Sequence, residues 1–219
     1  WRHWFRPEGG ATGTARQRGR APDRRPADPP AHRREGAAVD EDALAAQIGA
    51  GLPGCGLDAG QHPDLAAGLA AYLALLVRWN AKWNLTAVRD PRDMVVRHLF
   101  DSLAVDPWVR GPRMIYVGTG AGLPGIPLAL LRPADTNTLL DSARQRTRFL
   151  HNVMARLGLE TYEVVQARVE DYHGAAGFDT VVSRAFTSID GFAATAGHLC
   201  GPGGRLLAMA GRFPADDLA

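Results

Sequence analysis

A glycine-rich segment at 117–125, Val-Gly-Thr-Gly-Ala-Gly-Leu-Pro-Gly, has the most distinctive spacing of chemically useful residues in the chain. It follows a short apolar stretch at 114–117 that is typical of a buried strand, and it leads into a helical pattern at 123–131. Glycine lets the backbone turn sharply and approach a ligand closely, and the first turn of a helix offers unpaired N–H donors. The segment therefore predicts a loop that binds a nucleotide.

The glycine spacing fits two kinds of cofactor. Gly118, Gly120 and Gly122 follow the pattern of a methyltransferase loop, whereas Gly120, Gly122 and Gly125 match the dinucleotide fingerprint GxGxxG. A tight turn that binds no ligand is a third interpretation. Asp141 ends the next apolar stretch, where an acid accepts hydrogen bonds from ribose hydroxyls, although an acid there also suits a cap for the following helix. By themselves these residues predict a nucleotide cofactor and leave its identity open.

The elements expected around this loop alternate between strands and helices. Apolar runs and helical periodicity predict strands at 114–117, 136–140, 163–166, 180–183 and 205–209, and helices at 123–131, around 149–157 and at 188–199. Such alternation predicts an α/β fold, a doubly wound and mostly parallel sheet with right-handed crossovers and helices on both faces. A sheet of this kind binds ligands at the carboxyl ends of its strands.

The first half of the chain is organised differently. Residues 1–38 are rich in Arg, Pro, Gly and Ala and lack apolar periodicity, which predicts a disordered tail. Residues 39–110 carry helical patterns, including a helix start at Asp90-Pro91, and predict a small N-terminal helical extension. The α/β domain is expected at 111–219.

Charge divides the chain at the end of the predicted tail. Residues 1–38 hold nine arginines and four acids, a net +5, and the remaining residues hold 16 basic and 19 acidic groups, a net −3. A basic tail on a mildly acidic body favours nucleic-acid contact. The chain has two cysteines, Cys55 and Cys200, and lacks an apolar stretch of the roughly 18 residues that a membrane helix needs. We expect a cytoplasmic protein without a disulfide framework, a membrane span or a metal site.

Several blocks, in a fixed order along the chain, resemble one known family. These blocks are Arg97–Ser102 (RHLFDS), Val117–Pro127 (VGTGAGLPGIP), Leu140–Ser142 (LDS), Arg146–Leu150 (RTRFL) and Ser183–Phe186 (SRAF), with Trp79-Asn80 and Asn84–Thr86 as further matches. They resemble the bacterial 16S ribosomal RNA guanine-N7 methyltransferases, once called glucose-inhibited division protein B, over about residues 65–219. The resemblance implies an enzyme with S-adenosyl-L-methionine as cofactor and 16S ribosomal RNA or the small ribosomal subunit as partner. We expect the protein to be a monomer.

The resemblance also implies roles for individual residues. The residues it places at the cofactor are Gly118, Gly120, Gly122, Leu123, Asp141, Val169, Glu170 and Arg184. No catalytic base is expected, because N7 of guanine has a lone pair and no proton, and the protein mainly has to hold it in line with the methyl group. The candidates for RNA contact are His98, Arg144, Arg146, Arg148 and Arg212. The alternatives are a solvated helix face for the arginines at 144–148 and a hydrogen-bonded helix residue for His98.

Three departures from the family pattern favour a second hypothesis. Tyr116 stands where the family has an aspartate two residues before the first glycine, and Ala210 stands where it has a lysine. The family pattern also continues through two further strands beyond Ala219, so we expect a C-terminally truncated copy. The second hypothesis is a non-catalytic, RNA-binding relative that has kept the fold. A third, an NAD-dependent oxidoreductase, depends on the GxGxxG match alone.

Overall fold

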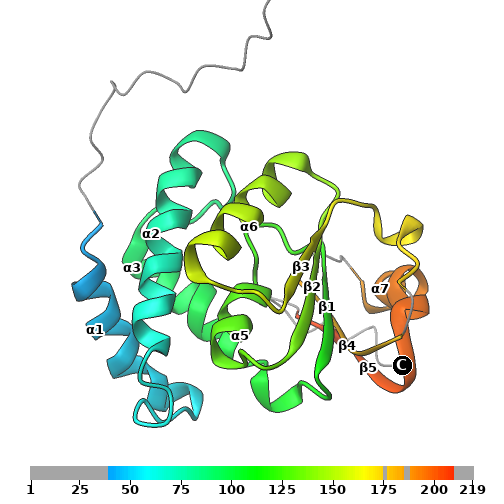
Figure 1. Ribbon diagram of the computed structural model, residues 1–219, viewed down its shortest axis with the longest axis horizontal. Coiled ribbons are helices and arrows are strands. Elements are labelled where there is room, and N and C mark those ends of the chain that lie inside the picture. The colour runs from blue at the N-terminus through cyan, green and yellow to red at the C-terminus, as the bar shows by residue number, and fades with distance from the viewer. Residues whose placement is uncertain (1–38, 175–176, 185–187, 210–219) are drawn as a thin grey trace, which may run out of the picture. The chain divides into compact units, whose positions relative to one another are not determined.

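The computed structural model describes residues 39–174, 177–184 and 188–209. The tail predicted at 1–38 lies outside the described residues, as do Ala210 and Arg212. None of the helices in the described ranges is long and apolar enough to cross a membrane. In chain order (Figure 1) the elements are α1 (Glu41–Gly51), η1 (Leu52–Cys55), α2 (Leu65–Trp83), α3 (Pro91–Met94), η2 (Val95–Phe100), α4 (Asp101–Leu103), η3 (Asp106–Trp108), β1 (Arg113–Val117), α5 (Gly125–Leu131), β2 (Thr136–Leu140), α6 (Arg144–Leu157), β3 (Tyr162–Val165), η4 (Val169–Asp171), β4 (Phe178–Ser183), α7 (Ile189–Ala196), η5 (Gly197–Leu199) and β5 (Cys200–Ala208).

Five parallel strands form one sheet in the order β3-β2-β1-β4-β5. The central strand β1 pairs with β2 on one side, where Val117 is opposite Leu140, and with β4 on the other, where Val117 is opposite Ser183. The chain thus moves outward from β1 to β3, then returns to β4 and continues to β5. The loop after β1 therefore lies where the winding reverses, which is where such sheets bind ligands. The predicted doubly wound α/β fold is confirmed.

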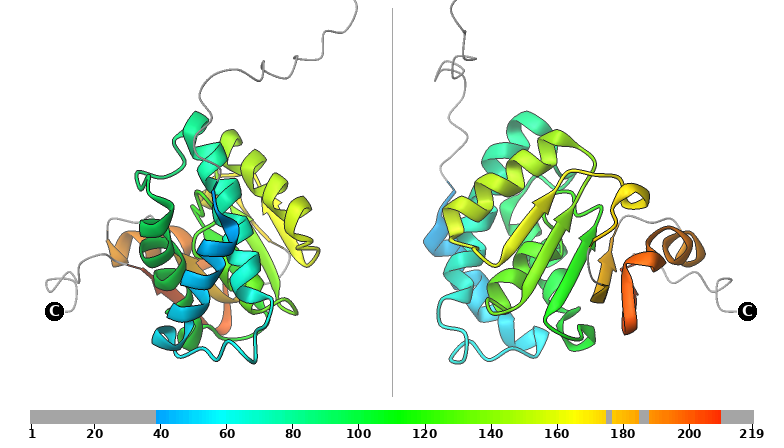
Figure 2. Two further views of the ribbon diagram at one scale, coloured as in Figure 1. Left: turned by 90° about the vertical axis from the view of Figure 1, so that its left-hand side faces the viewer. Right: turned by 45° about the vertical axis from the view of Figure 1, so that its right-hand side comes forward.

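Helices cover both faces of the sheet (Figure 2). Because successive side chains of a strand point to opposite faces, Met114 and Tyr116 of β1 share a hydrophobic cluster with α2, α5 and α6. Ile115 and Val117 share the other cluster with α7. The first cluster is the larger one and continues from the sheet into the N-terminal helices, where Leu69 of α2 is fully buried.

Two helices of the N-terminal part begin with an aspartate cap. Asp40 accepts a hydrogen bond from the N–H of Ala43 at 3.0 Å, and Asp90 accepts one from the N–H of Arg92 at 2.8 Å, so the cap predicted at Asp90 is confirmed. The apolar spacing of Val95, Leu99 and Leu103 predicts that the helix begun at Asp90 continues past them. The structure instead has a π-helical turn, Val95–Phe100, between α3 and α4. Such a turn widens the backbone spacing from i→i+4 to i→i+5, a change that apolar periodicity does not reveal.

Candidate functional site

The segment between β1 and α5 is a loop whose shape depends on glycine. Gly118, Gly120 and Gly122 have φ angles of 62°, 59° and 91°, which residues with a Cβ atom adopt only with strain. The carbonyl of Thr119 accepts hydrogen bonds from the N–H groups of Gly122 at 2.9 Å and of Leu123 at 3.0 Å. The loop is therefore a tight, internally bonded turn that leads from the carboxyl end of β1 into α5.

The Asp141 carboxylate joins this loop to the end of β2. It is buried, its Oδ2 accepts a hydrogen bond from the N–H of Gly120 at 2.9 Å, and its Oδ1 accepts one from the N–H of Ala143 at 2.9 Å. Arg146 adds an ion pair to Oδ2 at 3.4 Å. The acid therefore holds both the glycine loop and the turn before α6. Because each carboxylate oxygen accepts more than one hydrogen bond, Asp141 keeps capacity for the hydroxyls of a ligand.

A cavity of about 200 Å³ opens beside Asp141 at the carboxyl end of the sheet. Its lining residues are Val117, Gly118, Leu140, Asp141, Ser142, Arg146, Ala167, Arg168, Val169 and Glu170. The wall thus combines two acids, Asp141 and Glu170, and two arginines, Arg146 and Arg168, with apolar side chains. Carboxylates suit the hydroxyls of a sugar, and apolar side chains suit the flat face of a base. The arrangement has the chemistry that a nucleoside requires.

Apart from Arg184, the residues predicted at the cofactor divide into two groups. Those that line the cavity are Gly118, Asp141, Val169 and Glu170. Gly120 and Gly122 shape the loop instead, and Leu123 is packed into the core with 8% of its surface exposed. Arg146, considered for RNA contact, lines the cavity because the first turn of α6 brings it to Asp141. Ser142, two residues after the end of β2, was missed, although the strand-end rule applies to it as well.

Arg184, at the end of β4, binds the N-terminal helices. Its Nη2 lies 3.0 Å from Oδ2 of Asp101 and donates to the carbonyl of Arg97 at 3.3 Å. Both side chains of the ion pair are partly exposed, so the pair contributes about 0–1 kcal/mol to stability. It nevertheless ties the π-helical turn to the carboxyl edge of the sheet, the edge at which the cavity opens. A cofactor contact of Arg184 stays a prediction.

His98 lies inside the N-terminal helices. Its side chain is buried, and its Nε2 is 2.8 Å from Oγ1 of Thr86. The N–H of Thr86 in turn donates to Oδ1 of Asn80 at 2.9 Å. Direct contact with an RNA base requires an exposed imidazole edge, which this arrangement does not provide. The structure fits the interpretation of His98 as a hydrogen-bonded helix residue.

We expect His98 to make the protein less stable in mild acid. Burial, assisted by the positive charge of Arg184, holds the pKa of His98 below its ordinary value of about 6.5. The unfolded chain therefore takes up this proton at a higher pH than the folded protein. The contribution to the free energy of unfolding is complete above about pH 6.5 and is lost as the pH falls through the folded-state pKa. Urea denaturation at a series of pH values should show a shallower decline for His98→Gln than for the wild type, and parallel declines would contradict the assignment.

Arg144 and Arg148 are exposed on α6, four residues apart and hence on one face of the helix. Neither lines the cavity. An RNA contact therefore stays a prediction for both, and Arg212 lies outside the described residues.

Tyr116 is a core residue under α5. It is fully buried, its hydroxyl lies 3.5 Å from Sδ of Met114, and burial raises its pKa. Its ring is so close to Gly125 that a Cβ added there would come within 3.0 Å of it. Tyr116 thus has a packing role in this chain, and the buried carboxylate at the cavity is that of Asp141.

A parallel sheet with a glycine loop at its reversal point and an acid after the second strand defines a Rossmann-like cofactor-binding protein. A family model described as rRNA small subunit methyltransferase G matches residues 65–219. The chain therefore belongs to the rRNA small subunit methyltransferase G family, and the resemblance found in the sequence blocks is confirmed.

Individual relatives agree with the family model. The ribosomal RNA small subunit methyltransferase G of Alkalilimnicola ehrlichii is 53% identical over 154 residues, which cover 70% of each chain. The protein of the same name from Nitrosococcus oceani is 49% identical over 150 residues, 68% of this chain and 70% of its own. Among solved structures, coclaurine N-methyltransferase bound to N-methylheliamine and SAH has 11% identity and a TM-score of 0.47, covering 76% of this chain and 56% of its own.

Proposed function

We propose that this protein transfers a methyl group from S-adenosyl-L-methionine to N7 of a guanine in 16S ribosomal RNA. Family membership supports the reaction and the class of substrate. The observation that carries the proposal is the buried Asp141 carboxylate, which faces a cavity at the carboxyl edge of the sheet and is bonded to the glycine loop. This is where a Rossmann-like fold holds the ribose of its cofactor.

The residues of the cavity fit the adenosine part of this cofactor. Asp141 would accept hydrogen bonds from the ribose hydroxyls, while Leu140 and Val169 would pack against the adenine and Glu170 would lie at its edge. Gly118, which lacks a Cβ, lets the methionine part approach the backbone of the loop. When bound, S-adenosyl-L-methionine supplies an electrophilic methyl group on a sulfonium.

The reaction requires the protein to position the guanine and the cofactor, and it requires no proton transfer to a side chain. N7 of guanine has an exposed lone pair and no proton to lose, so a side chain acting as general base is unnecessary. The protein has to hold the base in line with the reacting carbon and keep water away from it, which removes most of the entropic cost of the reaction. The exposed carboxyl edge of the sheet, where the cavity opens, is the place at which the guanine would enter.

The exposed face of α6 is our candidate for RNA contact. Arg144 and Arg148 lie on the helix whose first turn also holds the cavity residue Arg146, and arginine pairs readily with phosphates. We expect the double change Arg144→Gln and Arg148→Gln to raise the KM for RNA about tenfold and to leave the Kd for S-adenosylhomocysteine unchanged. Arg156→Gln, near the other end of α6 and also exposed, is the matched control and should keep the wild-type KM. An unchanged KM in the double variant would identify this face as merely solvated.

The proposed reaction is tested by methyl transfer from radiolabelled S-adenosyl-L-methionine to small ribosomal subunits and, separately, to free 16S ribosomal RNA. Incorporated label should map to a guanine that becomes sensitive to chain cleavage specific for N7-methylguanine. Label on another atom or another RNA would overturn the stated substrate. Comparison of the two substrates also shows whether the assembled particle is required.

Binding measurements on the same protein distinguish the methyltransferase from the two alternative functions. Isothermal titration that detects S-adenosylhomocysteine binding and RNA binding, in a protein that transfers no methyl group, would favour the non-catalytic relative. Binding of NAD instead of S-adenosylhomocysteine would favour the oxidoreductase, a reading that has only the spacing of Gly120, Gly122 and Gly125 in its support.

A further inference from the structure

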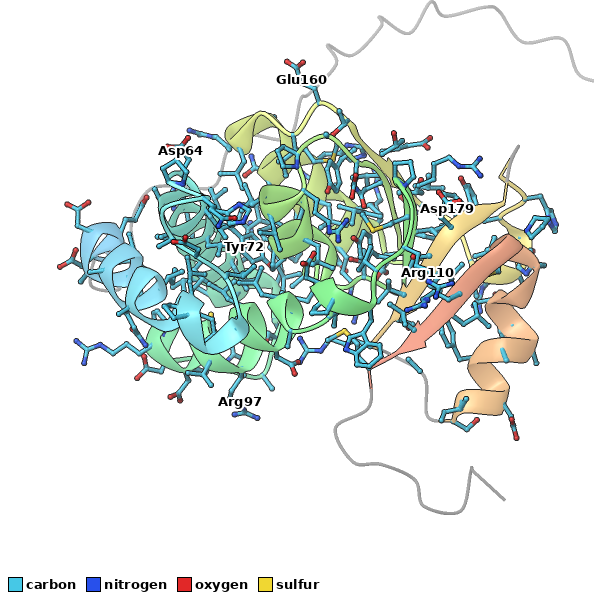
Figure 3. All side chains as sticks on the ribbon, turned by 90° about the horizontal axis from the view of Figure 1, so that it is seen from below. Asp64, Tyr72, Arg97, Arg110, Glu160 and Asp179 are labelled. Atoms are coloured by element: carbon cyan, nitrogen blue, oxygen red, sulfur yellow. The ribbon has the colours of Figure 1, made fainter. Side chains whose placement is uncertain are left out.

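A phenol from the N-terminal helices reaches the glycine loop. The hydroxyl of Tyr72, in the middle of α2, donates a hydrogen bond to the carbonyl of Ala121 at 2.7 Å, across 49 residues of sequence. Tyr72 is fully buried and lies among the side chains packed inside the helical part (Figure 3). Ala121 lies between two glycines of positive φ, Gly120 and Gly122. The contact is thus made to the most sharply turned part of the loop.

The other backbone bonds of the loop show why this contact matters. The carbonyl of Thr119 accepts from within the loop, and the carbonyl of Gly122 accepts from Ile126 at 2.6 Å as α5 begins. The donor to the Ala121 carbonyl comes from α2 instead. A buried carbonyl without a donor is costly, so the arrangement of the loop depends on Tyr72. Asp141 fixes the neighbouring Gly120 from the sheet, and the two side chains hold the loop from two different elements.

The Tyr72 side chain is itself held in place. Its ring packs against Phe149 of α6 with 6.4 Å between centroids, and Phe149 packs against Trp79 at 5.5 Å. Burial raises the pKa of Tyr72, so the phenol keeps its proton and remains a hydrogen-bond donor throughout the neutral range. A loop with three glycines has a large conformational freedom to lose, and a rigid donor from outside limits that freedom before any ligand arrives.

We propose that Tyr72 is a positioning residue for the cofactor: its hydroxyl keeps the loop in the arrangement that the cavity needs and so sets the affinity for S-adenosyl-L-methionine. The inference rests on the proposed function for the identity of the ligand. Affinity falls in proportion to the fraction of molecules whose loop is in the competent arrangement. The N-terminal helices, which supply none of the residues that line the cavity, thereby take part in cofactor binding.

The test compares two Tyr→Phe changes. Tyr72→Phe keeps the ring and removes the donor, whereas Tyr162→Phe removes a buried hydroxyl that has no partner among the described residues. Isothermal titration with S-adenosylhomocysteine should give a Kd about three- to tenfold higher for Tyr72→Phe and an unchanged Kd for Tyr162→Phe. Hydrogen exchange in the free protein should be faster at the amides of 120–123 in Tyr72→Phe alone. All titrations are run at one temperature, chosen so that the circular dichroism of both variants matches that of the wild type.

The possible results distinguish a failure of this inference from a failure of the proposed function. A wild type that binds S-adenosylhomocysteine, with a Tyr72→Phe variant of equal affinity and equal loop exchange, overturns the role of Tyr72 and leaves the proposed function standing. A wild type that does not bind S-adenosylhomocysteine overturns the proposed function. Loop exchange, measured without ligand, then still decides whether Tyr72 holds the loop. If Tyr162→Phe loses as much affinity for S-adenosylhomocysteine as Tyr72→Phe, the loss reflects general destabilisation. That result would also contradict the positioning role of Tyr72.

Discussion

Asp141→Ala is expected to raise the Kd for S-adenosylhomocysteine by about 100-fold or more. The change removes the acceptor for the N–H groups of Gly120 and Ala143, and it leaves Arg146 without its ion-pair partner. Each buried donor without an acceptor costs about 1–3 kcal/mol, and the ribose hydroxyls lose their acceptor as well. Isothermal titration measures the affinity, and thermal unfolding measures the part of the loss that falls on stability.

Asp179 offers a matched control for the loss of a carboxylate. Its Oδ2 also accepts a backbone N–H, that of Arg113 at 3.1 Å, but at the amino end of β1, far from Tyr72 (Figure 3). Asp179→Ala should leave the Kd for S-adenosylhomocysteine within about twofold of the wild-type value, because the cavity is at the opposite end of the strand. If the Asp141→Ala protein is folded and binds S-adenosylhomocysteine as tightly as the Asp179→Ala protein, Asp141 takes no part in cofactor binding.

Gly122→Ala is expected to lower the free energy of unfolding by about 3 kcal/mol and to weaken cofactor binding. The φ of Gly122 is 91°, which is strained for alanine, and the added Cβ would lie 2.5 Å from Cγ1 of Ile126 and 2.9 Å from Cδ2 of Leu150. Ile126 is in the first turn of α5, so relief of the clash requires a shift of the helix or of the loop. Urea denaturation measures the stability, and titration with S-adenosylhomocysteine measures the binding.

Gly158→Ala separates backbone strain from the clash. Gly158 ends α6 with a φ of 65°, and no atom lies within 4 Å of the position that its Cβ would occupy. This variant should lose about 1 kcal/mol from strain alone and keep the wild-type affinity for S-adenosylhomocysteine. Equal losses in the two variants would show that the contacts of Gly122 with α5 and α6 are unimportant.

The sequence predicted correctly those elements whose bounds are set by residues within one or two turns or strands of each other. The strand at Thr136–Leu140 has the predicted bounds, because its two threonines favour a strand and its final pair of leucines ends at an acid. The helix start at Asp90 was also foreseen, because a cap and a proline act within one turn. The glycine loop and Asp141 were placed correctly relative to the strands, since the connectivity of an α/β sheet brings the ends of neighbouring strands together.

Features that depend on contacts between residues far apart in the chain could not be predicted from the sequence. The strand predicted from residue 205 begins at Cys200 in the structure, because pairing with Phe178 of β4 overrides the low strand propensity of the glycines after Cys200. The contact of Tyr72 with Ala121 spans 49 residues, and a periodic apolar pattern identifies Tyr72 only as a buried helix position. Arg146 could be assigned to the cavity only once the first turn of α6 had been placed beside Asp141.

The hydrophobic cluster that runs from β1 into α2 has a thermodynamic consequence. Leu69 and Leu73 of α2 are buried in the same cluster as Ile126 of α5 and Phe149 of α6, and the described residues from 39 onward belong to one compact unit. Elements that share a core in this way unfold together in one cooperative transition. A ligand bound at the carboxyl edge of the sheet should therefore slow the global opening of α1, which does not line the cavity. Amide protection in α1 would then report occupancy of a site formed by residues more than sixty positions further along the chain.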